Sequence, residues 1–261
     1  MLRVRPIHFT SRLQEWRQLL TDLGLVQTTD DGDWQEFDAG SGRVALHHFT
    51  PGSAEDGTTA FGVEVGDLAE FARRTNEAGA VSGGTTTELI EADRGLSCRV
   101  TGLDGFSFLA DPATRAVDGT WTTSPAADPA LGVTAMWITT DTAAARQDLA
   151  NIGARPQRSS DTGDWADFTA KNGGRIGVQI GGAVGAGPLG FEYDGDLGTL
   201  LDRLTAAGHA AHIVDESYGR TLHVPNPDFT ELDFAELPNS PAGPTIWISE
   251  RQTDLYGYTE H

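Results

Sequence analysis

The chain repeats a stretch of its own sequence. The segment DDGDWQEFDAGSGRVAL at 30–46 returns about 131 positions later as DTGDWADFTAKNGGRIGV at 161–178. Glycine, aspartate, tryptophan, phenylalanine and arginine recur at matching places, with one residue inserted in the second copy. A repeat of this length in 261 residues indicates two related units, each large enough to bury a core. Each position of one half can therefore be compared with its counterpart in the other.

The charge of the chain limits its partners. With 38 acidic residues, 18 basic residues and a formal net charge of −20, the chain repels nucleic acid and anionic membranes. It has no long apolar run, and its first residues, MLRVRPIHF, lack the apolar core of a signal peptide. The single cysteine, Cys98, is expected to be a core thiol. We therefore expect a cytoplasmic protein with a small-molecule ligand and with no nucleic-acid or membrane partner.

The hydrophobic pattern predicts the same order of elements twice in each half: a strand, a helix and three further strands. The helix over 11–23 is the clearest, because Leu13, Trp16 and Leu20 recur at three- and four-residue spacing before Gly24. The other predicted helices cover 67–79, 142–152 and 196–207. Predicted strands cover 4–10, 33–38, 43–49, 61–65, 86–91, 96–101 and 106–110 in the first half, and 133–139, 165–169, 175–180, 190–193, 212–216, 220–224 and 230–236 in the second.

These predicted elements divide the chain into two domains. The first takes residues 1–112, a linker rich in Pro, Ala, Asp and Thr takes 113–130, and the second takes 131–238. A tail follows at 239–261 and is expected to add a strand at 245–249. In a monomer the two domains would form an internal pseudo-dimer, and a homodimer is the alternative.

Two short segments carry a resemblance to a known superfamily. They are LDGFSFLADP at 103–112 and VPNPDFTELDFAEL at 224–237, each near the end of one half. Together with the four modules, they resemble the vicinal oxygen chelate superfamily, which includes glyoxalase, bleomycin-resistance and extradiol dioxygenase proteins. The resemblance implies an α+β fold of two tandem domains, each with two βαβββ modules. In such a fold curved mixed sheets surround a cleft, the helices lie outside, and many members hold a divalent metal in the cleft.

The resemblance also assigns the metal-ligand positions of the superfamily to residues of this chain. They fall near Val4, Ala45, Ala60 and Leu109 in the first half, and near Thr134, Gly177, Pro188 and Asp233 in the second. A single carboxylate supplies too few donors for a divalent metal. The interpretation is that the usual metal centre is missing from both clefts, so that no cofactor is expected. A divalent metal held by displaced ligands is the alternative.

Strand alternation places other polar residues beside these positions. In the first half, His8, His47 and Glu64 are expected to share the cleft face. They are the candidate catalytic residues, because a neutral imidazole with a carboxylate partner can act as a base. The same three residues are also the alternative metal site, since two histidines and a carboxylate can form an open three-ligand centre. A third interpretation, in which the histidines are hydrogen-bonded residues of the cleft lining, stays open.

The corresponding residues of the second half are candidates for ligand binding. They are Trp137, Gln179, Glu192, His223, Glu231 and Asp233. Trp137 is expected to form a cleft wall, whereas Glu231 and Asp233 form either a pair that shares a proton or a solvated acidic edge. The repeated Trp34 and Trp165 are interpreted as structural anchors, because both copies keep them.

Two functional hypotheses follow. In the first, the protein binds a small aromatic or otherwise apolar molecule in a cleft without a metal, as in sequestering resistance proteins of the superfamily. In the second, it is a lyase, isomerase or dioxygenase-type enzyme that uses a displaced metal site or an acid/base pair. One half could also be purely structural. The sequence leaves open whether the protein is an enzyme and which cleft it uses.

Overall fold

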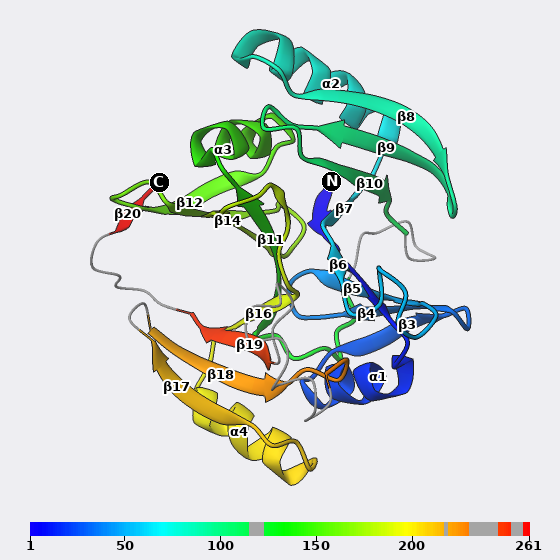
Figure 1. Ribbon diagram of the computed structural model, residues 1–261, viewed down its shortest axis with the longest axis vertical. Coiled ribbons are helices and arrows are strands. Elements are labelled where there is room, and N and C mark those ends of the chain that lie inside the picture. The colour runs from blue at the N-terminus through cyan, green and yellow to red at the C-terminus, as the bar shows by residue number, and fades with distance from the viewer. Residues whose placement is uncertain (115–122, 217–218, 230–244, 252–257) are drawn as a thin grey trace.

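The computed structural model describes residues 1–114, 123–216, 219–229, 245–251 and 258–261. Over these ranges the chain has four helices and three mixed sheets. Figure 1 shows the two halves beside each other, with the helices toward the top and bottom of the view and the strands between them. The predicted α+β fold class is confirmed. No helix in the described ranges is long and apolar enough to cross a membrane.

The first half contains ten strands and two helices. They are β1 (Leu2–Val4), β2 (Ile7–Thr10), α1 (Leu13–Asp22), β3 (Val26–Asp30), β4 (Trp34–Asp38), β5 (Arg43–His48), β6 (Thr59–Ala60), β7 (Gly62–Val65), α2 (Leu68–Ser82), β8 (Thr86–Ala92), β9 (Gly95–Thr101) and β10 (Ser107–Pro112). They form two five-stranded sheets, in the orders β3-β4-β5-β2-β6 and β1-β7-β10-β9-β8.

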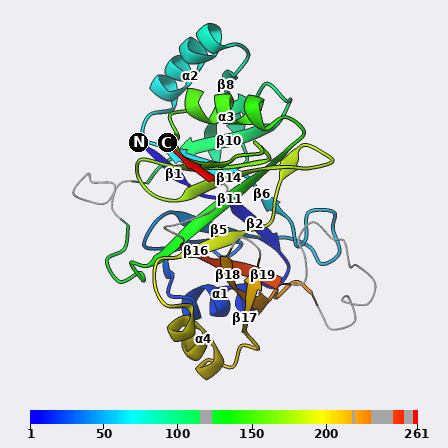
Figure 2. The same ribbon diagram turned by 90° about the vertical axis from the view of Figure 1, so that its left-hand side faces the viewer.

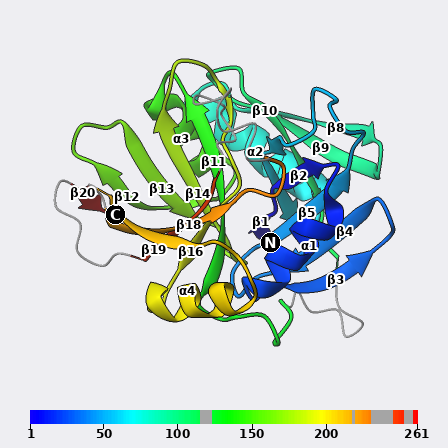
Figure 3. The same ribbon diagram turned by 60° about the horizontal axis from the view of Figure 1, so that its bottom comes forward.

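The second half repeats the order of helices and strands. Its described elements are β11 (Leu131–Thr139), α3 (Thr142–Asn151), β12 (Arg155–Ser160), β13 (Trp165–Thr169), β14 (Arg175–Ile180), β15 (Gly185–Ala186), β16 (Gly190–Tyr193), α4 (Leu197–Ala206), β17 (His212–Glu216), β18 (Gly219–Pro225), β19 (Thr245–Glu250) and β20 (Tyr258–Glu260). Its strands form one sheet in the order β17-β18-β19-β16-β11-β14-β13-β12-β20, with β15 paired to β11. Figure 3 shows this half on the left and the first half on the right.

The halves differ most at their first strand. In the second half β11 is continuous and pairs with both β14 and β16, which joins its two modules into one sheet. In the first half the equivalent strand is broken into β1 and β2 around Arg5 and Pro6. Pro6 has no N–H to donate to a neighbouring strand, although its carbonyl accepts from the Ala45 N–H. The sheet of the first half is therefore divided in two.

Strand register defines which residues correspond between the halves. Leu2 lies opposite Val65 as Leu131 lies opposite Tyr193, which makes Arg5 the counterpart of Thr134. The superfamily alignment drawn from the sequence paired Val4 with Thr134 and was therefore one residue out of step. On a strand, a shift of one residue moves every side chain to the other face of the sheet.

The tail completes the sheet of the second half. The predicted strand at 245–249 is confirmed as β19, which runs parallel to β16 as β10 runs parallel to β7. By register, Trp247 is therefore the counterpart of Leu109. Because β19 and β20 both pair with strands of this half, the sheet continues beyond the expected boundary at 238. The predicted strand at 230–236, with Glu231 and Asp233, lies outside the described residues.

Aspartates define where three of the helices begin. The carboxylates of Asp67, Asp141 and Asp196 each accept a hydrogen bond from the backbone N–H three residues further on, at the starts of α2, α3 and α4. Such a cap contributes about 1 kcal/mol to helix stability. The predicted helix starts at 67, 142 and 196 agree with these caps to within a residue or two. The apolar side chains beneath the helices form one core cluster that spans both halves.

The two halves pack through their helices. Figure 2 shows α2 beside α3 at one end of the molecule and α1 beside α4 at the other. At the first contact the Asn151 side chain donates to Thr85 Oγ1 at 2.6 Å, and at the second Arg203 donates to the Leu23 carbonyl at 2.6 Å. The open faces of the sheets, opposite the helices, therefore do not form the interface between the halves.

A turn from each half carries an aspartate that accepts hydrogen bonds from residues near the start of the other half. Asp228, which follows β18, accepts hydrogen bonds from Thr10 and from the Trp16 indole N–H. In the same way Asp104, which precedes β10, accepts from the Trp137 indole N–H at 3.0 Å and from the hydroxyl of Thr139, the counterpart of Thr10. These two aspartates interlock the halves in a nearly symmetric way.

Candidate functional site

Each sheet has a helix face, packed against the helices, and an open face on its other side. The strand β11 shows the two faces most clearly, because buried and half-buried residues alternate along its nine positions. In the first half the open faces of the two sheets are turned toward each other and are joined by ion pairs of Arg43 with Glu64 and of Arg5 with Glu36. This space between the two sheets is the cleft of the first half.

The expected cluster of His8, His47 and Glu64 does not form. His8 is on the helix face, where its ring lies 4.1 Å from the Trp16 ring and its Nε2 is hydrogen-bonded to Asp228 at 2.7 Å. His47 and Glu64 are on the open faces. The parallel pairing of β2 with β5 sets His8 one position out of step with His47, so alternation turns them to opposite sides of the sheet. The prediction that the three residues share a face is wrong.

Trp137 also lies on the helix face. Its side chain is fully buried, donates from its indole N–H to Asp104 and packs 4.8 Å from the Phe106 ring. It takes in the second half the place that His8 takes in the first. The prediction that Trp137 forms a cleft wall is wrong, because the sequence alone left its face uncertain by one residue.

Glu64 lies at the centre of a buried network of ion pairs. Arg3 donates from Nε to Glu64 Oε2 at 2.6 Å, while Arg43 Nη1 lies 3.3 Å from Oε1. The Arg5 Nε lies 3.8 Å from the same Oε1. Both oxygens of this carboxylate therefore face guanidinium groups, and the carboxylate, with its side chain 1% exposed, is held in place rather than free to bind a ligand.

Arg5 is the central cation of this network. Its Nη1 lies 3.0 Å from Glu36 Oε1, its Nη2 pairs with Asp111, and Glu64 is the third carboxylate around it. The three carboxylates come from β4, β10 and β7. Burial alone would raise the pKa of Glu36, but the charges of Arg5 and Arg43 outweigh burial and hold that pKa below its ordinary value of 4.5. Glu36 is therefore ionised at neutral pH.

A divalent metal does not fit this cleft. The carboxylates of Glu36, Glu64 and Asp111 already surround the Arg5 guanidinium, and a metal ion among them would meet a fixed positive charge. Within the described parts of the chain, no group of three or more His, Cys, Asp or Glu side chains is arranged to hold a metal. The absence of a metal centre from both clefts remains a prediction.

The second half keeps part of the network. Arg175 Nε lies 2.6 Å from Glu192 Oε1, and its Nη1 lies 2.8 Å from Asp167 Oδ2, at positions that match the first half. Thr134, however, takes the place of Arg5. Burial raises the pKa of Glu192, and the charges of Arg175, Arg158 and Arg251 offset this rise only in part. The expected ligand-binding role of Glu192 stays a prediction.

Four rings gather on the open face of the first half. This aromatic mouth consists of Phe9, Trp34, His47 and Phe49. The His47 ring lies 5.5 Å from Trp34 and 5.1 Å from Phe49, in edge-on contacts typical of aromatic pairs. Burial, and next the charge of Arg94, lower the pKa of His47, so its imidazole is neutral at neutral pH. Trp34, expected to be a structural anchor, thus lies in the cleft.

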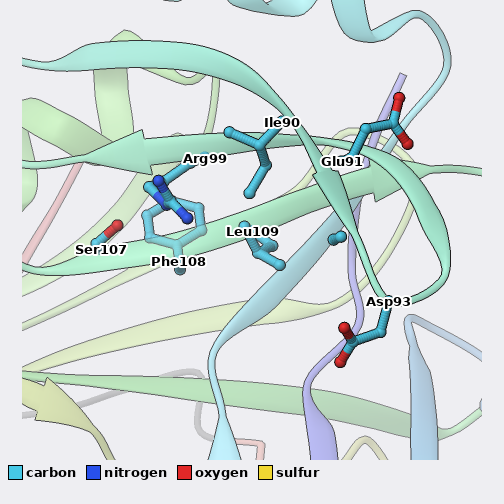
Figure 4. A pocket seen from close by; sticks show the side chains of 8 residues that line it. Ile90, Glu91, Asp93, Arg99, Ser107, Phe108 and Leu109 are labelled. Carbon is cyan, nitrogen blue, oxygen red and sulfur yellow. The ribbon is translucent and has the colours of Figure 1, made fainter.

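A pocket of about 360 Å³ lies on the open face of β8, β9 and β10, and Figure 4 shows it from close by. It is lined by Ile90, Glu91, Ala92, Asp93, Arg99, Ser107, Phe108 and Leu109. Ile90 and Leu109 supply apolar side chains, while Asp93, Arg99 and Ser107 supply polar atoms. Small-molecule sites commonly have volumes of about 300 to 1,000 Å³ and this mixed lining.

The turn between β8 and β9 joins the pocket to the aromatic mouth. Arg94, next to Asp93 of the pocket, places its guanidinium carbon 4.2 Å from the centre of the Trp34 ring. Its Nη2 lies 3.5 Å from Asp31 Oδ2. The charge of Asp93 also acts on His47, opposing the lowering of its pKa. The pocket and the mouth are therefore adjoining parts of one site, with rings on one sheet and apolar side chains on the other.

Two other expected ligand-binding residues of the second half, Gln179 and His223, lie on its open face. Gln179, at the end of β14, is exposed and is the counterpart of His47. The His223 ring stacks on Trp247 with centroids 5.6 Å apart and lies 5.5 Å from His212. Burial lowers the pKa of His223, and His212 adds to the effect. Whether they bind a ligand stays a prediction.

Sequence reasoning missed the arginines of the cleft. Two signals could have identified them: Arg3 and Arg5 lie two apart on one strand, and Arg43 returns as Arg175 in the repeat. Residues two apart on a strand share a face, so the first strand should bring two cations to its open side. The contact of Arg94 with the aromatic mouth had no local signal, since it depends on how two sheets face each other.

The comparisons with known proteins identify the fold. No family model and no curated protein matches the sequence. Among solved structures, the 2,3-dioxygenase LapB from Pseudomonas sp. KL28 is similar, with 15% identity, a TM-score of 0.59, and 97% of this chain and 92% of that chain covered. Homoprotocatechuate 2,3-dioxygenase from Arthrobacter globiformis is 17% identical with a TM-score of 0.57, and the match covers 95% of this chain and 78% of that chain. A mutant of 4-hydroxymandelate synthase from Streptomyces coelicolor is 15% identical with a TM-score of 0.52, and the match covers 98% of this chain and 93% of that chain.

These similarities place the chain in a structural class. It has the fold of the extradiol dioxygenases, with tandem βαβββ modules, which is the fold that the resemblance to the vicinal oxygen chelate superfamily implies. At 14–17% identity the likeness concerns the fold. Activity has to be argued from the residues of the cleft.

Proposed function

We propose that the protein binds a small organic molecule in the first-half cleft, between the aromatic mouth and the adjoining pocket, and that it does so without a metal ion. One observation carries the proposal: among the residues that the structure describes, the aromatic mouth has no matching ring cluster at the equivalent positions of the second half, and the pocket adjoins it in the first half. The counterparts of Phe9 and His47 are Ile138 and Gln179, which cannot form a cluster of rings. Residues that only maintained the fold would be expected in both copies.

The lining of the site indicates what it can bind. Ile90 and Leu109 offer apolar contact on one side, and the edges and faces of four rings offer contact on the other. A flat or bulky apolar group would gain most from this arrangement, at about 25 cal/mol for each Å² removed from water. Ser107 and Arg99 supply hydrogen-bonding groups at the pocket rim that can orient such a group.

Metal-independent binding is proposed on the charge balance below the pocket. The charges of Arg5 and Arg43 neutralise the carboxylates that a metal cation would otherwise bind. The ion pairs of these two arginines also connect strands of both sheets. The cleft can therefore keep its shape without a metal. Among the described residues, no group of three or more His, Cys, Asp or Glu side chains is arranged to hold a metal, which supports the proposal of metal-independent binding.

A thermal-shift screen of aromatic and alicyclic small molecules tests this function, with two matched variants to locate the site. Ile90→Glu puts a charge into the pocket, while Leu89→Glu puts the same charge on the other face of the same strand, where Leu89 is 44% exposed. We expect binders that raise the melting temperature of the native protein and of Leu89→Glu but not of Ile90→Glu. Binders that stabilise all three proteins equally would contradict the proposed site.

An enzyme of the lyase, isomerase or dioxygenase type is the alternative. Its support is His47, since a neutral imidazole beside a pocket can accept a proton from a bound molecule. The acid/base version predicts that a molecule found in the screen is converted during incubation, and that His47→Gln, which copies Gln179 of the second half, abolishes conversion while binding persists. Mass spectrometry of the incubated ligand distinguishes the two: an unchanged ligand supports binding alone.

A further inference from the structure

We infer that the ligand of this cleft is an organic cation, an ammonium or guanidinium group on an apolar body; this inference rests on the proposed function. The observation behind it is that the aromatic mouth already holds a cation. The guanidinium carbon of Arg94 lies 4.2 Å from the centre of the Trp34 ring, within the range of a cation–π contact. The chain's own side chain thus shows which kind of group this surface accepts.

Arg94 is held loosely enough to be displaced. Its side chain is 48% exposed and its ion-pair partner Asp31 is 62% exposed, at a separation of 3.5 Å. An exposed pair of this kind contributes little to stability. The arginines of the buried network, by contrast, have side chains only 2% to 6% exposed and several close partners. A ligand cation can therefore replace Arg94 over Trp34 without breaking the network that holds the sheets.

The surroundings of the mouth favour a positive ligand. Asp31, Asp33 and Asp93 lie around the rings, and Glu91 lines the pocket. The basic groups nearby are Arg94, Arg99 and Arg5, whose guanidinium carbon lies 5.2 Å from the centre of the Trp34 ring but whose charge is balanced by Glu36, Glu64 and Asp111. Arg99 is itself paired with Glu88 at 3.4 Å. The net charge of −20 acts in the same direction over longer distances. An anionic ligand would have to overcome these carboxylates.

The mouth also has an apolar extension for the rest of the ligand. The turn that carries Arg94 leads directly to Ala92 and Ile90, which line the pocket. A cation bound over Trp34 would thus have its apolar body beside Ile90 and Leu109. This arrangement predicts that small inorganic cations bind weakly, because they have no apolar surface to bury in the pocket. A bulky ammonium should bind most tightly.

Calorimetric titration with three probes of similar size tests the inference: benzyltrimethylammonium, 4-tert-butylbenzyl alcohol and 4-tert-butylbenzoate. We expect the cation to bind most tightly, and its affinity to fall when the salt concentration is raised. The variant Arg94→Gln removes the built-in competitor and should tighten binding of the cation about threefold to tenfold. Arg73→Gln, on the exposed side of α2, makes the same change in net charge far from the cleft and is the control.

A second pair of variants covers the case in which a change at the mouth disturbs folding. Trp34→Leu removes a buried ring, so the melting temperature of this variant is measured first to establish that it folds. Phe49→Leu removes a half-buried ring of the same cluster and should weaken binding of the cation without unfolding the chain. A loss of affinity in Phe49→Leu, with Arg73→Gln unchanged, supports the inference.

The outcomes separate the ligand class from the proposed function. If the alcohol or the benzoate binds and Ile90→Glu abolishes that binding while the ammonium does not bind, the cleft is a ligand site but the inferred class is wrong. If the ammonium binds and neither Arg94→Gln nor Phe49→Leu changes its affinity, the mouth is not its site and the inference is overturned. If no molecule of any charge binds, both the inference and the proposed function fail.

Discussion

The two halves of this chain share a fold but differ in what fills their open faces. Where the first half has Arg5, caged by three carboxylates, the second half has Thr134. Where the first half has a ring, His47, the second half has the exposed amide of Gln179. Both halves keep one arginine, Arg43 or Arg175, paired to carboxylates on two strands.

This difference separates two kinds of residue. The arginine kept in both copies is joined to strands that must lie side by side in either half, so it belongs to the architecture. The residues that changed lie around the cleft, where a change alters what can bind. Comparison of the copies thus identifies the site by what they do not share.

The largest predicted contrast concerns the shared arginine. We expect Arg43→Met to lower the free energy of unfolding by about 3 to 5 kcal/mol, because Asp38, Glu36 and Glu64 would lose a buried cation. Arg175→Met should cost about 1 to 3 kcal/mol, since its side chain is 15% exposed against 6% for Arg43. Urea unfolding followed by circular dichroism measures both values. Equal losses of unfolding free energy would mean that the two networks stabilise the fold equally, which would contradict this contrast.

The next contrast concerns the caged cation. Arg5→Thr gives the first half the residue of the second and leaves Glu36, Glu64 and Asp111 with one guanidinium fewer. Oxygen-rich cages suit Ca²⁺ or Mn²⁺, so we expect these ions to stabilise the variant, by about 2.7 kcal/mol at a hundred times their dissociation constant. The native protein should show no such gain in a thermal-shift titration. Equal stabilisation of both proteins would show that Arg5 does not take the place of a cation.

A smaller contrast concerns the aspartates that interlock the halves. Asp228→Asn removes a charged acceptor shared by His8, Thr10 and Trp16 and should cost about 2 to 3 kcal/mol. Asp104→Asn affects two donors of the other half, Trp137 and Thr139, besides the Phe106 N–H of its own turn, and should cost about 1 to 2 kcal/mol. Unfolding curves of the two variants show which one loses more free energy of unfolding. A larger loss for Asp104→Asn would contradict the prediction that Asp228 makes the stronger contact between the halves.

The smallest contrast is in the dependence of stability on pH. Glu36 has a folded pKa below 4.5, so it contributes stability that is present above pH 4.5 and is lost as the pH falls through its lower folded pKa. Glu192 has a folded pKa above 4.5, so the stability that it contributes is present below pH 4.5 and is lost as the pH rises through its higher folded pKa.

Two variants separate these opposite contributions. Glu36→Gln should flatten the loss of melting temperature on acidification. Glu192→Gln should remove part of the decline in melting temperature as the pH rises above 4.5. Melting temperatures recorded on both sides of pH 4.5 check both signs. If Glu192→Gln steepened the decline, the pKa of this carboxyl would be lowered, not raised.

The sequence predicted the architecture well because the signals for it are repeated. Helix ends follow from Gly24 and from the aspartates that cap three helices, and strand order follows from the module pattern. These features are local, and each half gives them independently. The tail strand at 245–249 was also predictable from its apolar residues.

The site was predicted less well, because it depends on strand faces and on distant contacts. His8 and Trp137 were each assigned to the open face, and both lie on the other one, since a register known only to within one residue cannot fix a face. Glu64 was correctly given a place beside the cleft, but the arginines that hold it come from other strands. Arg94 meets Trp34 only after two sheets are folded against each other.

The central claim is that the first-half cleft binds a small molecule and that its own arginines make a metal unnecessary. Calorimetric titration of chelator-treated protein with the strongest binder from the screen, repeated after addition of Fe²⁺, Mn²⁺ or Zn²⁺, tests it most directly. We predict about one molecule bound per chain and a dissociation constant that agrees within about twofold with and without the metals. Binding that appears only once a metal has been restored would contradict the account.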